Sequence, residues 1–274
     1  MKLSIVDVFA EDQYAGNQLA VVHDAASLSE QAMQDIAREM NFSETTFVLG
    51  QSNGRARVRI FTPEWELPFA GHPTVGTAWV LAKGKGSIVL DLPIGEVGVS
   101  FDDAGIGWMT PPPVALNAQF DPERAAALIG LSSDDLAADY PPQFAEVGPQ
   151  FILIGVKELR SLQQAKLDEA LYNAYKAEGL GVQCVFVFSP EPYEPSADFS
   201  SRMFFHSGNI REDPATGSAN TAFAAYLLAH RGALGDVVVD QGVEIKRPSR
   251  LYLRVGEPIQ VGGRVVQTVA GELC

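Results

Sequence analysis

Alternation of apolar and polar residues runs through most of the chain and predicts a protein built largely from strands. Residues 2–9 alternate and are rich in β-branched and aromatic side chains, and Gly16-Asn17 turns the chain before the apolar segment 19–22. These two segments predict a β-hairpin. Further strands are expected where alternation or short apolar runs recur, at residues 42–49, 55–61, 87–92, 96–101, 151–156, 182–188 and within 236–269.

Helical spacing is confined to a few segments. It predicts helices at residues 29–40, 74–83, 122–129, 164–178 and 214–230. The last of these is apolar nearly all round from Ala222 to Ala229, and such a helix must be enclosed by other elements. A curled, mostly antiparallel sheet around a central helix satisfies this requirement, so the predicted fold class is α+β.

The sequence repeats itself, which predicts that this architecture is built twice. A shift of 141 positions places Asp213 on His72, Pro214 on Pro73 and Gly217 on Gly76. Upstream, the segment 59–61 matches the segment 202–204 at a shift of 143. A repeat of this length indicates two pseudo-symmetric halves. The proline run at residues 111–113 is the best boundary between them.

Each copy of the repeat resembles a loop that enters a helix. Proline suits the first helical position, and Asp213 before Pro214 would be a good N-cap. Small residues in the next turn would leave backbone N–H groups uncovered, and these groups bind anions such as carboxylates. If the halves face each other, two helix N-termini meet at one cleft. The alternative is plain capping and close packing.

Composition narrows the function classes. The chain has 274 residues, a net charge of -14 and a pI near 4.7, which disfavours nucleic acid and acidic membranes as partners. The cysteines and the four histidines show no metal-ligand spacing. The longest apolar run is too short to span a bilayer, and no signal peptide is recognisable. A cytoplasmic protein is expected.

Glu44 is the acid of greatest interest. In a strand it shares a face with Phe42, Thr46 and Val48. Burial among such neighbours would raise the pKa of its carboxyl, as proton transfer near neutrality requires. The alternative is an edge-strand carboxylate in water. The glutamates in proline-containing loops are expected to be solvated instead.

The two copies of the repeat contain further polar candidates. His72, at a helix N-terminus, should lose its proton and then donate or accept a hydrogen bond, although it could equally serve as a cap. Asp213 could orient an amino group or His72. Ser218 could donate to a ligand carboxylate, but it is a poor nucleophile without an adjacent base.

Four motifs together resemble the phenazine biosynthesis PhzF-like family. They span nearly the whole chain and lie at residues 16–22, 43–47, 71–78 and 213–219. The resemblance implies a fold similar to diaminopimelate epimerase, with two domains, each a barrel-like sheet around a central helix, and an active site between them. A last strand is expected to return to the first domain. The expected domains are therefore residues 1–113 with 265–274, and residues 114–264.

The resemblance also implies a chemistry. Glu44 would be the general acid/base of an isomerase similar to trans-2,3-dihydro-3-hydroxyanthranilate isomerase, with His72 and Asp213 as further catalytic residues. Substrate-binding residues would be Asn17, Ser43, Gly71, Thr216, Gly217 and Ser218. No cofactor or metal is implied, the substrate is a small molecule, and a homodimer is expected.

One departure from the epimerases favours isomerisation. Those relatives use two cysteines, at positions equivalent to the two copies of the repeat, to exchange a proton between opposite faces of the substrate. Neither copy contains a cysteine, because Cys184 and Cys274 lie outside them. A single carboxyl group suits proton transfer on one face. The alternatives are a catalytically silent metabolite-binding module and an epimerase with a non-cysteine acid/base.

Overall fold

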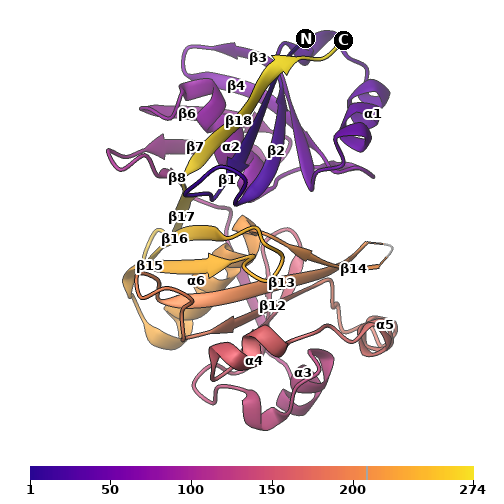
Figure 1. Ribbon diagram of the computed structural model, residues 1–274, viewed down its shortest axis with the longest axis vertical. Coiled ribbons are helices and arrows are strands. Elements are labelled where there is room, and N and C mark those ends of the chain that lie inside the picture. The colour runs from indigo at the N-terminus through magenta and orange to yellow at the C-terminus, as the bar shows by residue number, and fades with distance from the viewer. Residues whose placement is uncertain (208) are drawn as a thin grey trace. The chain divides into compact units, whose positions relative to one another are not determined.

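A computed structural model describes residues 1–207 and 209–274 (Figure 1). The chain divides into two compact units, residues 1–111 with 260–274 and residues 112–259. The sequence-based division had the chain return to the first domain at residue 265. In the structure it returns at residue 260, because β17 (Gln260–Gly263) pairs antiparallel with β8 (Gly107–Met109) of the first unit.

The first unit consists of a curled sheet and two principal helices. The predicted hairpin is confirmed, since the first two strands pair antiparallel. The bounds are β1 (Lys2–Val8), β2 (Asn17–Val22), α1 (Glu30–Met40), β3 (Glu44–Ser52), β4 (Arg55–Phe61), β5 (Glu66–Leu67), α2 (Gly71–Ala82), β6 (Ser87–Leu92), β7 (Gly95–Phe101) and β18 (Val265–Glu272), with a 3-10 turn at Ala25–Ser27.

The sheet of the first unit follows a single path from β18 to β17. Its order is β18-β1-β2-β3-β4-β6-β7-β8-β17, and β5 adds to β4. The pairs β2–β3 and β4–β6 are parallel, and α1 and α2 connect them. The two ends of this path, β18 and β17, are consecutive strands separated only by Arg264. The sheet therefore begins and ends on the same segment of the chain.

Helix α2 lies inside the curled sheet. It contacts strands along the whole path, namely β1, β2, β3, β6, β7, β8 and β18. Residues 71–78 are all buried or nearly so. A Cβ at Gly76 would lie 2.6 Å from side-chain atoms of Leu19 and Val8, so glycine is needed where the helix meets β1 and β2. The predicted enclosed helix is therefore present in the first unit.

The outer face of this sheet is covered by α1. Its Met33 and Ala37 pack on a buried cluster that includes Phe47 and Phe61, whose rings meet edge to face at 5.4 Å. Ser29 caps the helix by accepting from the Ala32 N–H. The part of the sheet under α1 is thus buried on both faces, which explains the apolar run of β2 at residues 19–22.

The second unit contains the same kinds of element in the same order, with additional small helices. The bounds are β9 (Ala115–Gln119), α3 (Pro122–Leu128), β10 (Gln143–Glu146), β11 (Gln150–Gly155), α4 (Leu159–Gln164), α5 (Glu169–Ala177), β12 (Cys184–Ser189), β13 (Phe199–Ser207), β14 (Asn209–Asp213), α6 (Gly217–Arg231), β15 (Gly235–Gln241) and β16 (Ser249–Val255), with a 3-10 turn at Ser133–Asp135.

Strand pairing in the second unit repeats that of the first. The path is β9-β10-β11-β12-β13-β15-β16, with β14 added to β13. Again two pairs are parallel, β11–β12 and β13–β15. Helix α6 takes the place of α2 and contacts β9, β10, β11 and β16. This match confirms the repeat inferred from the sequence.

One predicted helix of the second unit was wrong. The segment 164–178 is not continuous, because α4 ends at Gln164 and α5 begins at Glu169. Asp168 accepts from the Leu171 N–H and starts α5 as an N-cap. The extended residues between the helices let both pack on the outer face of the sheet, where Leu162 and Tyr172 join one apolar cluster. No helix in the described residues is long and apolar enough to cross a membrane.

An arginine–glutamate pair recurs in both units. Arg59 on β4 donates to Glu66 on β5 at 2.5 and 2.6 Å, and its guanidinium lies over Phe61. Arg202 on β13 donates in the same way to Glu212 on β14 at 2.7 and 3.1 Å, over Phe204. Both pairs fix the short strand that leads into the helix. The recurrence of this arginine in both copies of the repeat therefore has a structural role.

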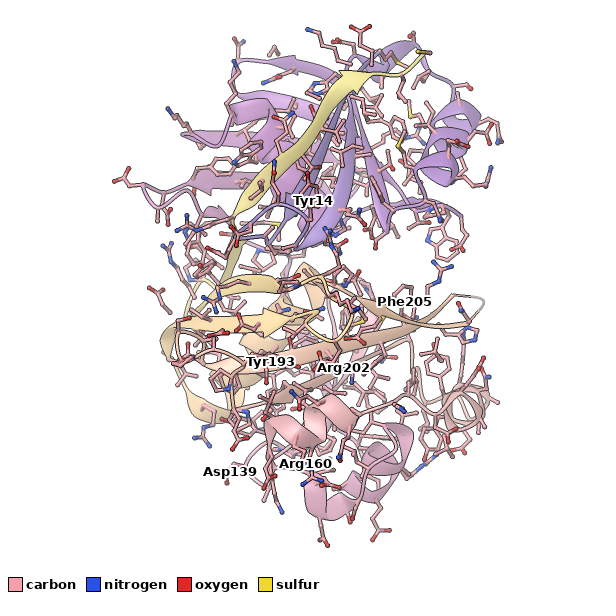
Figure 2. The ribbon with its side chains drawn as sticks, in the orientation of Figure 1. Tyr14, Asp139, Arg160, Tyr193, Arg202 and Phe205 are labelled. Atoms are coloured by element: carbon pink, nitrogen blue, oxygen red, sulfur yellow. The ribbon has the colours of Figure 1, made fainter. Side chains whose placement is uncertain are left out.

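The second pair is the more deeply buried. Arg202 also donates to three backbone carbonyls at the end of α4, those of Leu162, Gln163 and Ala165. Glu244 accepts from the Tyr193 hydroxyl and lies 3.8 Å from Arg202. Tyr193 and Arg202 are labelled in Figure 2. This network ties five segments of the second unit together: β13, β14, the end of α4 and the segments that contain Tyr193 and Glu244.

Removal of Arg202 should therefore destabilise the protein more than removal of Arg59. Arg202→Met leaves Glu212 buried without its cation and should cost about 3–5 kcal/mol of unfolding free energy. Arg59→Met should cost less, because the Arg59 and Glu66 side chains are 22% and 28% exposed, against 9% and 8% for the other pair. Urea unfolding measures both, with the exposed Arg38→Met as control. Equal losses for the two variants would contradict this interpretation.

Candidate active site

Glu44 is held at the start of a central strand. It is the first residue of β3, opposite Leu19 of the parallel strand β2, and β4 flanks β3 on the other side. Thr46 and Val48 on the same strand are buried, and the Glu44 side chain is only 15% exposed. The alternative of an edge-strand carboxylate in water is thereby excluded.

A titratable neighbour of Glu44 is His72, the second residue of α2. Its Nδ1 atom lies 3.4 Å from the Glu44 Oε2 atom, and the His72 side chain is 5% exposed. Burial lowers the pKa of His72 to about 3, against a smaller opposing effect of a hydrogen bond to the Gln18 backbone. At neutral pH the pair is a carboxyl group beside a neutral imidazole. Such a pair can share a hydrogen bond without forming an ion pair.

The expected loss of the His72 proton is thus confirmed, but its expected cause was wrong. The sequence suggested the positive end of a helix, whereas desolvation dominates in the structure. Sequence reasoning missed this because the burial of His72 depends on how the whole sheet curls around α2.

A buried hydrogen bond beneath this pair joins the strand to the helix. The Thr46 and Thr77 hydroxyls lie 2.8 Å apart, both fully buried. Thr46 is two residues beyond Glu44 on β3, and Thr77 is about one turn beyond His72 on α2. Because hydroxyl pairs have directional geometry, this contact fixes the spacing between the two elements that carry Glu44 and His72.

The other predicted first-unit residues lie on β2, which pairs with β3, and at the starts of β3 and α2. Asn17 is the buried first residue of β2, Ser43 directly precedes β3, and Gly71 is the first residue of α2. Helix α2 therefore starts three residues earlier than the predicted residue 74, and Pro73 is its third residue, where a missing N–H is also tolerated. Gly71 and His72 consequently belong to the helix N-terminus.

In the second unit the predicted N-cap was wrong. Asp213 ends β14, and α6 begins at Gly217 with Thr216 at the N-cap position. The Asp213 carboxylate instead accepts from the Thr216 hydroxyl at 2.5 Å. Gly217 and Ser218 form the first turn of α6, whose N–H groups have no carbonyl partner within the helix. The predicted residues Asp213, Thr216, Gly217 and Ser218 thus share one helix N-terminus.

Gln241, which the sequence analysis did not single out, organises this N-terminus. Its amide nitrogen donates to the Asp213 carbonyl at 2.9 Å and to the Thr216 hydroxyl at 3.0 Å. Its amide oxygen accepts from the Thr216 N–H at 3.3 Å and from Asn220 at 3.1 Å. Gln241 lies at the end of β15, so no local motif links it to Asp213.

The repeat places Cys184 where the first unit has Glu44. Phe61 on β4 pairs with Thr45, the residue after Glu44. Its repeat equivalent Phe204 pairs with Val185, the residue after Cys184. Burial, with a smaller effect of Asp213, raises the pKa of the Cys184 thiol to about 12. The second unit therefore has a protonated thiol at this position, where the first unit has the carboxyl group of Glu44.

The predicted site residues form two groups, one in each unit. The first holds Asn17, Ser43, Glu44, Gly71 and His72, and the second holds the residues at the N-terminus of α6. Within residues 1–207 and 209–274, no three His, Cys, Asp or Glu side chains gather as they would around a metal ion.

The buried neutral His72 should make stability depend on pH. An unfolded histidine binds a proton below pH 6.5, whereas folded His72 does so only near pH 3. Between these values acid favours the unfolded state, by up to about 1.4 kcal/mol per pH unit. Denaturant unfolding from pH 7 to about pH 4 should therefore show wild type losing stability relative to His72→Gln. Parallel curves for the two proteins would contradict the assignment.

Comparison with known proteins identifies relatives of the whole chain. The phenazine biosynthesis-like protein family model (PhzC-PhzF) matches residues 6–271. The trans-2,3-dihydro-3-hydroxyanthranilate isomerase of Pseudomonas aeruginosa is 35% identical over 91% of this chain and 88% of its own length.

Solved structures agree over the full length. A phenazine biosynthesis protein of the PhzF family from Bacillus anthracis covers all of this chain, which in turn covers 99% of that one, with a TM-score of 0.86 and 27% identity. A predicted epimerase from Pseudomonas aeruginosa matches with a TM-score of 0.83 and 32% identity, over 99% of this chain and 98% of its own. The expected diaminopimelate epimerase-like fold is confirmed. The chain therefore belongs to the phenazine biosynthesis-like protein family and is an isomerase.

Proposed function

We propose that the protein is a cofactor-independent isomerase in which Glu44 moves a proton within a small carboxylate-bearing substrate. The observation that carries this proposal is the enclosed Glu44 carboxyl at 3.4 Å from a neutral, buried His72. A similar reaction is named for the Pseudomonas aeruginosa relative, trans-2,3-dihydro-3-hydroxyanthranilate isomerisation.

The proposed step uses Glu44 as base and then as acid. The Glu44 carboxylate takes a proton from one substrate carbon, and the electron pair of the broken C–H bond shifts the adjacent double bond. The protonated Glu44, whose proton exchanges with solvent, then delivers a proton to the distal carbon of the original double bond, which carries the electron pair after the shift. Atoms and charge balance without an oxidant, and one carboxyl group serves one face of the substrate.

His72 supports Glu44 in this scheme by being neutral. An uncharged imidazole 3.4 Å from the carboxyl adds no positive charge that would hold Glu44 permanently ionised. An imidazolium at the same place would lower the pKa of the carboxyl and weaken it as a base. The burial that keeps His72 neutral therefore suits proton transfer near neutral pH.

The substrate carboxylate is proposed because two helix N-termini carry the predicted binding residues. Gly71 begins α2, and Gly217 and Ser218 begin α6. Unpaired N–H groups and the helix dipole favour an anion at such positions. The chain carries a net charge of -14, so attraction of an anion must come from local groups of this kind.

Glu44→Gln tests the proposed function. The variant keeps the shape of the side chain and removes its acid, so turnover should fall about 100-fold or more. Trans-2,3-dihydro-3-hydroxyanthranilate and a panel of cyclic unsaturated carboxylic acids serve as probes. Thermal shifts report binding, and NMR in heavy water reports deuterium entering carbon positions.

The expected result is a probe that stabilises both proteins but acquires deuterium only with wild type. Glu96→Gln, on an exposed residue paired with Arg55 in the same unit, is the control and should keep full activity. Near-full turnover by Glu44→Gln would refute the role of Glu44. Binding without exchange in either protein would favour a silent metabolite-binding module.

A homodimer in the cytoplasm is the proposed state of the protein, and family resemblance is its support. Light scattering at micromolar concentration should give twice the 29.5 kDa of one chain. The mass of a single chain would overturn the dimer.

A further inference from the structure

We propose that Gln241 is a positioning residue for the reaction: it fixes the orientation of Asp213 and of the first turn of α6. This inference rests on the proposed function, in which that turn belongs to the site. Gln241 is completely buried at the end of β15, and its side chain connects only to groups of the segment 213–220 among the hydrogen bonds described above.

The partners of Gln241 permit one orientation of its amide. The Asp213 carbonyl can only accept, and the Thr216 N–H can only donate. The amide nitrogen must therefore face Asp213 and the amide oxygen must face Thr216, at 2.9 and 3.3 Å. A flipped amide would place the Gln241 oxygen against the Asp213 carbonyl oxygen and the Gln241 NH2 group against the Thr216 N–H. The network thus has a fixed direction.

That direction extends to the Asp213 carboxylate. Because the Thr216 hydroxyl accepts from Gln241, its own hydrogen is available for the Asp213 Oδ2 atom, 2.5 Å away. Gln241 therefore fixes the orientation of the Thr216 hydroxyl. That hydroxyl in turn donates to one carboxylate oxygen of Asp213. Asn220, also fully buried, donates to both the Gln241 oxygen and the Thr216 carbonyl and closes the network.

The repeat shows that the fold does not need this glutamine. Arg57 pairs with Asp91 in the first unit, and its equivalent Ser200 pairs with Asp240 in the second. Leu92 therefore occupies the position of Gln241, and it is buried too. The first unit forms the same sheet around α2 with an apolar residue there. The polar network around Gln241 is accordingly needed to hold Asp213 and Thr216 at the N-terminus of α6, and the sheet forms without it.

Gly242, which follows Gln241, also contacts the loop that carries Asp213. Gly242 has φ +77°, and a Cβ there would lie 2.5 Å from the Pro214 carbonyl oxygen. The end of β15 thus contacts the backbone of the 213–216 loop twice, through the Gln241 side chain and through the Gly242 backbone. A loop held at both points has little freedom to reorient Asp213.

The test compares Gln241→Leu, which copies the first unit, with Gln241→Glu. The glutamate keeps an acceptor for the Thr216 N–H and removes both donors to the Asp213 side. Tyr226→Phe is the matched control, because it removes a partly buried hydrogen bond of 3.0 Å to the Pro141 carbonyl from the same helix. All are measured on the full chain with trans-2,3-dihydro-3-hydroxyanthranilate as substrate probe.

Both Gln241 variants should lower kcat about 10- to 100-fold, the effect of misplacing a site group by around an ångström, while Tyr226→Phe keeps kcat. The double variant Gln241→Leu/Asp213→Asn should be no slower than Asp213→Asn alone, since both changes act through one group. Multiplied losses, or unchanged kcat in a folded Gln241 variant, would overturn the positioning role.

A second readout does not depend on turnover. Hydrogen exchange of residues 216–220 should become at least about 10-fold faster in both Gln241 variants and stay unchanged in Tyr226→Phe, because the network no longer holds the first turn. Equal exchange in all proteins would overturn the inference. Retained turnover in Glu44→Gln, by contrast, refutes the proposed function and leaves this exchange result standing.

Discussion

Each unit depends on enclosing a helix that has no polar face. Helices α2 and α6 are buried over most of their length, so a flat sheet that covers one side would leave apolar surface in water. The strands must therefore curl around the helix, and two parallel connections bring them back, one before the helix and one that contains it. Once the helix is enclosed, its N-terminus remains the end where backbone N–H groups lack partners.

This enclosure also determines the electrostatics of the candidate site. His72 is neutral because the curled sheet removes it from water, and Glu44 is shielded because its strand lies between two others. The second unit applies the same burial to different residues. Its thiol at the position of Glu44 stays protonated, and its helix N-terminus is held by an amide network. Similar packing thus supports two different chemical environments.

The sequence contained much of this fold and most of the candidate residues. Alternation of apolar and polar residues predicted the strands, and the recurrence of His72-Pro73 as Asp213-Pro214 predicted the repeat. Both signals consist of short stretches of sequence that can be recognised without knowledge of the packing. Errors arose where distant packing decides. The prolines were poor guides to both helix starts, since α2 begins two residues before Pro73 and α6 three residues after Pro214. Gln241 was missed because its contacts with Asp213 span 28 residues.

The return of the chain to β1 has a consequence for synthesis. Residues 112–259 are contiguous, so the second unit has all its strands once they have left the ribosome. Most of the first unit is translated earlier, yet β1 lacks its partner until β18 (Val265–Glu272) has emerged from the ribosome. The usual N-terminal-first order of domain folding is therefore reversed for the final step. Until then β1 presents an open edge that a chaperone or another chain can occupy.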